Sequence, residues 1–300
     1  MQKKLFLSIK IFFTLILTVY LIRAQGISRI YDTVAAGDIG SFLCACALIP
    51  LFILLKVIKW HAMARNSGTK EPFISSLRSV LIGLGFGLFT PGRAGEIIRI
   101  RYYPDVDKVM LGGLVVIDRI IDLITILLVS IYFFASRKLL VLTISIFIIC
   151  IMSIFLMKYV LNLLCKLPSE PGAKRIHIFF RKIGAGSKVL TAENMSFYCG
   201  LSFIIWGVLI VQFWFIINSF YMTSFEVALA TLPIIQLGNL IPITIAGLGV
   251  RENLSVLVMH LYNIPDTVAA MSAFCLFAID IALTGIIGLI LFGSDFGRRT

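Results

Sequence analysis

The chain has 300 residues, of which 59% are hydrophobic and only 14% are charged, and its mean hydropathy is +1.01. A soluble domain of this length has too little interior to bury so much apolar surface, so the composition predicts a polytopic membrane protein. The formal charge of +12 is typical of basic loops that set membrane topology and contact anionic headgroups, and we do not expect binding to nucleic acid.

Eight apolar runs follow one another along the chain, and each is close to the ~20 residues that cross a bilayer. They cover roughly residues 5–22, 39–58, 73–90, 109–135, 139–157, 197–219, 227–246 and 267–292. The first run follows Lys3 and Lys4. It is long for the core of a signal peptide and lacks a clear cleavage site, so we predict that it is the first span.

Basic residues gather in two linkers and at both ends of the chain. The linker at residues 56–70 contains no acid and carries Lys56, Lys59, Arg65 and Lys70. The linker at residues 158–195 is a longer basic loop, and the chain ends close after Arg298. By the positive-inside rule, both linkers and both termini are expected in the cytoplasm.

Eight straight spans would contradict this assignment, because three apolar runs separate the two basic linkers. The conflict disappears if residues 73–103 form a re-entrant hairpin from the cytoplasm and residues 227–262 form one from the outside. The predicted fold is therefore all-α, with about six spans and two re-entrant helical hairpins in a single transmembrane domain, residues 1–300. Residues 1–135 and 139–295 would then form an inverted-topology repeat.

The first predicted hairpin contains the sequence FTPGRAGEIIR and is broken at Pro91 and Gly92. A helix that starts near Arg93 would point its amide end at this break, and Arg99 adds a planar fork that suits phosphate. We therefore predict an anion site, most naturally for a lipid phosphate. In the simpler interpretation, Arg99 and Arg101 are interface anchors and Arg93 pairs with Glu96.

The second predicted hairpin contains LIPITIAGLGVRE, a similar break followed by closely spaced glycines and two charges. Its candidate ligand-binding residues are Asn239, Gly247, Gly249, Arg251 and Glu252. Buried glutamates are costly unless they are paired or protonated. Glu96 is expected to pair with Arg251 and Glu252 with Arg93, or either glutamate could be a proton-coupling group.

The run at 109–135 contains three ionisable residues in the sequence DRIIDL. Asp118 and Asp122 are four residues apart and share a helix face, and Arg119 lies beside that face. We expect these charges to face the protein interior near the first hairpin. Asp280 is the acid of the last run, and Arg251 is its candidate partner.

Motifs for catalysis and metal binding are absent. The sequence has no P-loop, HExxH or GxSxG motif, and its six cysteines form no CxxC pair. We therefore predict no catalytic residue, metal or cofactor, and expect that the protein is not an enzyme.

Three motifs, FTPGRAGEIIR, DRIIDL and PITIAGLGVRE, resemble the transmembrane domain of the lysylphosphatidylglycerol synthase and flippase-like family. The matching positions are Pro91, Gly92, Arg93, Gly95, Glu96, Arg99, Asp118, Arg119, Asp122, Gly247, Gly249, Arg251 and Glu252. The resemblance implies lipid translocation, and we expect no lipid synthesis because no soluble aminoacyltransferase domain follows the last run. One departure is Asp280, which stands in a span where the family pattern suggests an arginine.

The leading hypothesis is a translocator of an anionic phospholipid, or of a polyprenyl or glycolipid phosphate, in the cell's inner (cytoplasmic) membrane. One alternative is an integral-membrane transferase that acts on a lipid phosphate. Another is a non-catalytic partner that stabilises a membrane glycosyltransferase. The expected partners are the lipid, the membrane and either a second copy of the chain or such an enzyme.

Overall fold

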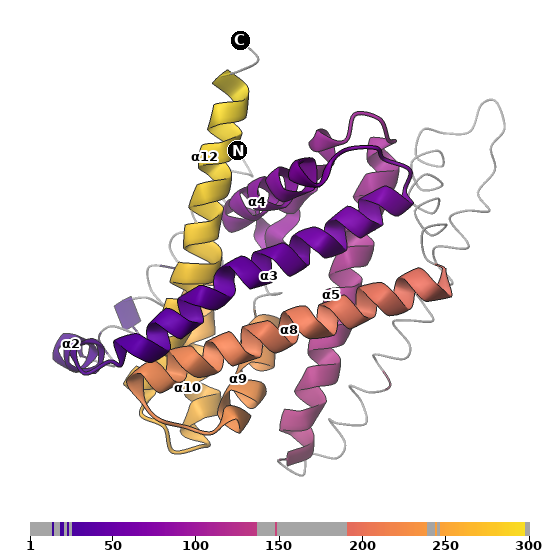
Figure 1. Ribbon diagram of the computed structural model, residues 1–300. Helices are drawn as coiled ribbons and strands as arrows, with labels where there is room; N and C mark the ends of the chain where they lie inside the picture. Colours follow the sequence, from indigo (N-terminus) through magenta and orange to yellow (C-terminus); the bar gives the residue numbers. More distant parts are fainter. Residues whose placement is uncertain are drawn as a thin grey trace, which may run out of the picture. The chain divides into compact units, whose positions relative to one another are not determined.

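The computed structural model describes residues 26–136, 191–238 and 247–297, together with residues 14, 19–20, 23, 148 and 244. Every regular element in these ranges is helical, as predicted (Figure 1). The chain divides into two units. Unit 1 contains residues 1–52, 84–95 and 207–300, and unit 2 contains residues 53–83 and 96–206. Each unit thus draws on both predicted halves of the chain.

Three helical stretches in the described residues are long and apolar enough to cross a membrane: Ile39–Asn66, Glu193–Phe220 and Asp266–Asp295. The first is α3, the second is α8 (Ala192–Phe220), and the third joins α11 (Asp266–Phe277), η3 (Ala278–Leu283) and α12 (Thr284–Gly297). At 28 to 30 residues each exceeds the ~20 that a bilayer requires. They confirm the runs at 39–58, 197–219 and 267–292 as candidate spans.

A fourth long helix, α5 (Lys108–Ser136), has 29 residues and confirms the helix expected at 109–135. It differs from the three candidate spans because Asp118, Arg119 and Asp122 lie in its middle. All three are placed about 15–21 Å from its first residue at 1.5 Å per residue.

The first predicted helix break is confirmed, whereas most of the second one lies outside the described residues. Helix α4 (Phe73–Phe89) stops before Pro91, where a 3₁₀ helix, η1 (Pro91–Tyr102), begins. Helix α9 (Phe225–Gly238) ends before the second break, and α10 (Val250–His260) follows it and packs against α9. With 14 and 11 residues, α9 and α10 are each shorter than the ~20 that a span requires. Whether these pairs re-enter the membrane stays a prediction.

Within unit 1, α4 and α12 cross closely through glycine. A Cβ atom at Gly85 would lie 2.8 Å from the carbonyl oxygen of Gly285, so any larger residue at Gly85 would push the two helices apart. Phe86 and Phe292 pack edge to face beside this crossing. Small residues thus let α4 approach the last candidate span.

The apolar run at 39–58 predicted the start of α3 but neither its cap nor its far end. Asp38 caps α3 by accepting hydrogen bonds from the backbone N–H groups of Gly40 and Ser41. The hydroxyl of Ser41, together with these N–H groups, holds the pKa of the Asp38 carboxyl below its ordinary value. At its other end α3 continues to Asn66, so Lys59 lies inside a helix rather than in the linker to which the sequence assigned it.

Several predictions fall outside the described residues. These are most of the first span at 5–22, almost all of the run at 139–157, and the basic loop at 158–195 up to its last few residues, where α8 begins. The span count, the terminal orientation and the inverted repeat therefore stay predictions. A short amphipathic helix, α2 (Ile27–Ala35), was not predicted, and it exposes Ile27, Tyr31 and Val34 along one side.

Candidate functional site

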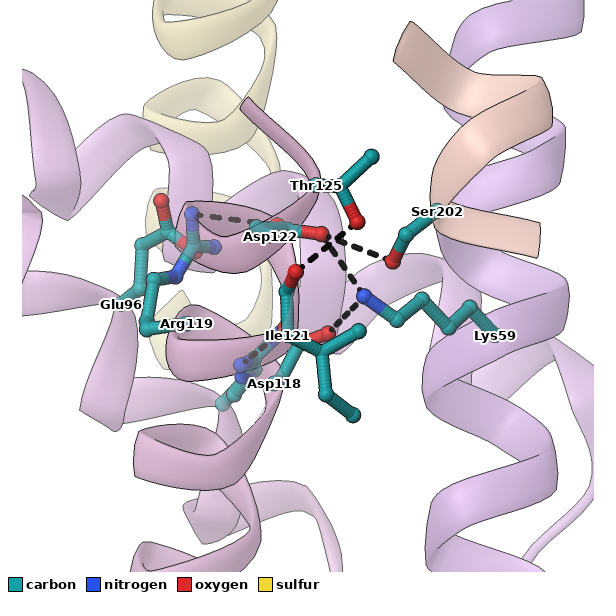
Figure 2. Close-up of polar contacts among 9 residues, drawn as sticks. Lys59, Glu96, Asp118, Arg119, Ile121, Asp122, Thr125 and Ser202 are labelled. Atoms are coloured by element: carbon teal, nitrogen blue, oxygen red, sulfur yellow. Dashed lines mark hydrogen bonds and ion pairs between the residues drawn. The ribbon is translucent and has the colours of Figure 1, made fainter. Parts of the chain in front are cut away.

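A buried network of ionisable side chains lies in unit 2, and its centre is the pair of aspartates on α5. The Lys59 Nζ atom, from α3, lies 2.8 Å from Asp118 Oδ1 and 2.7 Å from Asp122 Oδ1. Ser202, from α8, donates a further hydrogen bond of 3.1 Å to Asp122. Because Asp118 and Asp122 are one helical turn apart, a single amine reaches both. The predicted shared face is confirmed, and its main partner is a lysine 59 residues before Asp118 (Figure 2).

Arg99 of η1 holds the other side of Asp118. Its Nη2 atom lies 2.9 Å from Asp118 Oδ2, and its guanidinium carbon lies 3.8 Å from the centre of the Trp60 ring. Tyr103 packs against Trp60 and donates a hydrogen bond of 2.8 Å to Ser76. Arg99 is only 3% exposed, so ion pairing and cation–π stacking hold it inside the protein. It is not the interface anchor of the simpler interpretation.

Glu96 of η1 forms an ion pair with Arg119 of α5. The Arg119 guanidinium also lies 3.8 Å from Asp122 Oδ2. Figure 2 shows this pair on one side of α5, with Lys59 and Ser202 on the other. The Arg119 side chain is 32% exposed, whereas the Glu96 side chain is 4% exposed. Among the network's ionisable side chains, Arg119 is therefore the cation that a ligand reaches most easily.

The network is balanced in charge. Three cations (Lys59, Arg99 and Arg119) face three carboxylates (Glu96, Asp118 and Asp122) through the contacts above. Removing any one member leaves a buried charge without its counterion. Because burying an unpaired ion costs several kcal/mol, such a change should lower the stability of the fold. The arrangement places cations against both aspartates. It does not place them as free bases.

The second motif forms the start of α10 in unit 1. Gly247 and Gly249 adopt left-handed backbone angles, with φ of 78° and 83°. Glu252 accepts a hydrogen bond of 2.7 Å from the backbone N–H of Gly249 and so satisfies one free donor at the first turn of α10. Arg251 is fully buried, with its guanidinium carbon 5.9 Å from the centre of the Phe277 ring. The motif thus specifies a tight turn as well as a charge.

Replacing Gly249 with alanine should destabilise the protein by about 1–2 kcal/mol, because a side chain strains the left-handed conformation. The matched control is Gly200→Ala in the middle of α8, where nothing lies within 4 Å of the added Cβ atom. There alanine should be neutral or stabilise the helix by up to about 1 kcal/mol. Unfolding of both purified variants in detergent measures the difference, and equal stabilities would contradict this role of the turn.

Asp280 lies in η3, a π-helical turn between α11 and α12. Gln212 of α8 donates a hydrogen bond of 2.8 Å to Asp280 Oδ1. From the sequence, Arg251 was the expected partner of Asp280. The pairing of Asp280 with Arg251 stays a prediction. Gln212 is a partner of Asp280 that was not predicted.

The structure thus brings five predicted site residues into one network, namely Glu96, Arg99, Asp118, Arg119 and Asp122. Gly92 and Arg93 lie at the start of η1, but the Arg93 side chain and all of Asn239 lie outside the described part. The backbone N–H of Gly95 donates a hydrogen bond of 2.6 Å to the Thr90 hydroxyl, and a Cβ atom there would collide with the Phe86 carbonyl. Gly95 therefore serves close packing at the break. The convergence of both motifs on one ligand stays a prediction.

Sequence reasoning missed Lys59, Ser202 and Gln212. A signal for Lys59 was available, because Phe52 lies seven residues before it and Met63 four residues after it, at the spacing of one helix face, and both are buried. A lysine among such residues lies at the buried face of a helix. Ser202 and Gln212 are single polar residues in an apolar run and gave no comparable signal.

Comparison with known families gives a match over almost the whole chain. The family model for the lysylphosphatidylglycerol synthase TM region matches residues 6–288, and the chain belongs to this family. A comparison with curated proteins gave no match. Family membership and the apolar helices together make the chain a multi-pass membrane protein.

Proposed function

We propose that this member of the family moves an anionic lipid across the membrane, and that the lipid phosphate binds to Arg119. The lipid is a phospholipid or a polyprenyl- or glycan-linked phosphate. A family named for the membrane region of a lipid-modifying protein supports a lipid-related function. The choice of translocation rests on the chain's own charges and helix breaks.

The observation that carries the proposal is the unequal exposure of the Glu96–Arg119 pair. Arg119 is the exposed partner, and Glu96 is the buried one. A phosphate that approaches Arg119 would replace Glu96 as its counterion, and the planar guanidinium can bind two phosphate oxygens at once. When the lipid leaves, Glu96 closes the pair again. Binding and release are then an exchange of the phosphate and Glu96 at Arg119, so Arg119 has an anionic partner in both states.

The broken helices support movement between two faces. Re-entrant hairpins at residues 73–103 and 227–262 would place their breaks inside the membrane, where backbone groups line a wet cavity. With both termini in the cytoplasm, the two halves of the chain have inverted topology. Rocking of one half against the other would expose Arg119 to each leaflet in turn.

A panel of headgroup-labelled lipids in proteoliposomes tests the proposal. The expected result is that one phosphate-bearing class crosses the bilayer faster with protein than in protein-free vesicles and is recovered chemically unchanged. A covalently altered lipid would favour the transferase alternative. No protein-dependent movement of any lipid, under any ion gradient, would overturn the proposal.

A further inference from the structure

A second polar pair, remote in sequence from the unit 2 network, lies inside the last candidate span. Asp280 is 7% exposed and lies about 21 Å along the helix that starts at Asp266, which is close to mid-membrane depth. Gln212, its hydrogen-bond donor on α8, is fully buried. The other amide atom, Gln212 Oε1, is buried and has no hydrogen-bond partner in the described structure.

The backbone around Asp280 is irregular. The six residues Ala278–Leu283 form a π-helical turn within an otherwise α-helical stretch. The Thr284 hydroxyl donates a hydrogen bond to the Asp280 carbonyl oxygen. Single π turns inside α-helices are frequent at functional sites because they widen the helix and redirect a side chain. Here the turn contains the buried carboxylate of Asp280.

The unsatisfied oxygen of Gln212 can accept a hydrogen bond from Asp280 when Asp280 is protonated. A carboxylate only accepts hydrogen bonds, so it binds the amide NH₂ group, as observed. A protonated carboxyl group also donates one, and the Gln212 oxygen of the same amide can accept it while the amide N–H keeps donating to the other carboxyl oxygen. A buried amide oxygen without a donor is costly. That cost is relieved when Asp280 takes up a proton.

The groups around the pair come from three further helices. On α10, Arg251 lies against the ring of Phe277, one turn before Asp280, and Glu252 caps the same helix. On α3, the Cys46 thiol is close enough to interact electrostatically with Asp280, and with Cys275 of α11. One buried guanidinium favours the charged carboxylate, while burial favours the neutral acid. The carboxyl group can therefore exist in either form.

We propose that Asp280 and Gln212 form a proton-binding site within the last candidate span. Protonation adds one H⁺ from the aqueous phase to a carboxylate oxygen of Asp280, changes its charge from −1 to 0, and adds a hydrogen bond from the new O–H to Gln212 Oε1. A role for this site in coupling lipid movement to a proton gradient rests on the proposed function. The proton site itself does not.

Infrared difference spectroscopy on the full chain in lipid bilayers tests the site directly. On acidification, the wild type should gain the C=O stretching band of a protonated buried carboxyl group. Asp280→Asn should lack this band, and Asp280→Glu should restore one at a shifted frequency. Gln212→Leu should move the titration midpoint by about one pH unit or more, because each unit reflects about 1.4 kcal/mol of differential interaction. Identical spectra for the wild type and Asp280→Asn, or a midpoint unaffected by Gln212→Leu, would overturn the proposal.

Two further experiments distinguish failure of the proton site from failure of the proposed function. If the band at constant pH responds to replacing K⁺ with Na⁺, the ligand is a metal cation and the proton site is wrong. In proteoliposomes, the ratio of lipid movement with and without a pH gradient should exceed one for the wild type and equal one for Asp280→Asn. If no lipid moves at all, the proposed function fails while the infrared result still decides the proton site.

Discussion

Replacing Lys59 with methionine is expected to destabilise the protein by about 3–5 kcal/mol, because it leaves two buried carboxylates without their shared cation. Methionine keeps much of the length of the side chain, so the loss reports the charge more than the packing. Both contacts are short and buried, at 2.8 Å to Asp118 and 2.7 Å to Asp122. The free energy of unfolding of the purified protein in mild detergent measures the effect.

A lysine further along the chain, Lys70, provides the control. Lys70 is exposed, and Lys70→Met should change stability by less than about 0.5 kcal/mol. The double variant Lys59→Met/Asp122→Asn removes one charge of each sign and should recover part of the loss, with a coupling energy of roughly 0.5–3 kcal/mol. A Lys59→Met protein as stable as the wild type would show that the buried network does not support the fold.

Replacing Glu96 with glutamine is expected to slow translocation by about tenfold or more. Without Glu96, no internal anion replaces the lipid phosphate at Arg119, so an interaction worth about 1.5–3 kcal/mol must break before the lipid leaves. The variant frees Arg119 from its internal counterion, so it should hold phosphate more tightly than the wild type does. Adding Arg119→Gln removes the cation as well and should abolish protein-dependent movement. Rates in proteoliposomes measure both effects.

The matched control for this series is Arg65→Gln, which removes an exposed arginine near the end of α3. It should leave the rate within about twofold of the wild type, as expected for a surface charge away from the site. If the double variant Glu96→Gln/Arg119→Gln moves lipid at the wild-type rate, Arg119 does not bind the headgroup. Unfolding of each variant, measured in parallel, separates slow transport from loss of folded protein.

Local chemistry made part of this structure predictable. Pro91 cannot donate a backbone hydrogen bond, and the predicted break occurs where α4 ends and η1 begins. Gly249 lies at the start of α10 with the positive φ that glycine favours. Asp118 and Asp122 share a face because their spacing of four is close to one helical turn. In each case a few neighbouring residues decide the geometry.

The partners in the network depend on tertiary packing and were not predictable in the same way. Lys59 is separated from Asp118 by 59 residues and Ser202 from Asp122 by 80, so neither pairing leaves a periodic signal. Two cations, Arg93 and Arg251, were predicted partners for Glu96, and the packing of η1 against α5 brings Arg119 to it. The π turn at Asp280 likewise has no marker in the sequence. Interactions between distant helices decide these features.

Lipid retention by the purified protein, measured by native mass spectrometry, tests most directly whether Arg119 exchanges Glu96 for a phosphate. The lipids compared are a phosphate-bearing lipid and the diacylglycerol with the same chains, which lacks phosphate. For the phosphate lipid we predict that Glu96→Gln retains most, the wild type less, and Glu96→Gln/Arg119→Gln least. The first and last should differ by about tenfold or more, the worth of one charge-assisted interaction. Diacylglycerol should show no such order. Equal retention of the phosphate lipid by all three proteins would contradict the account.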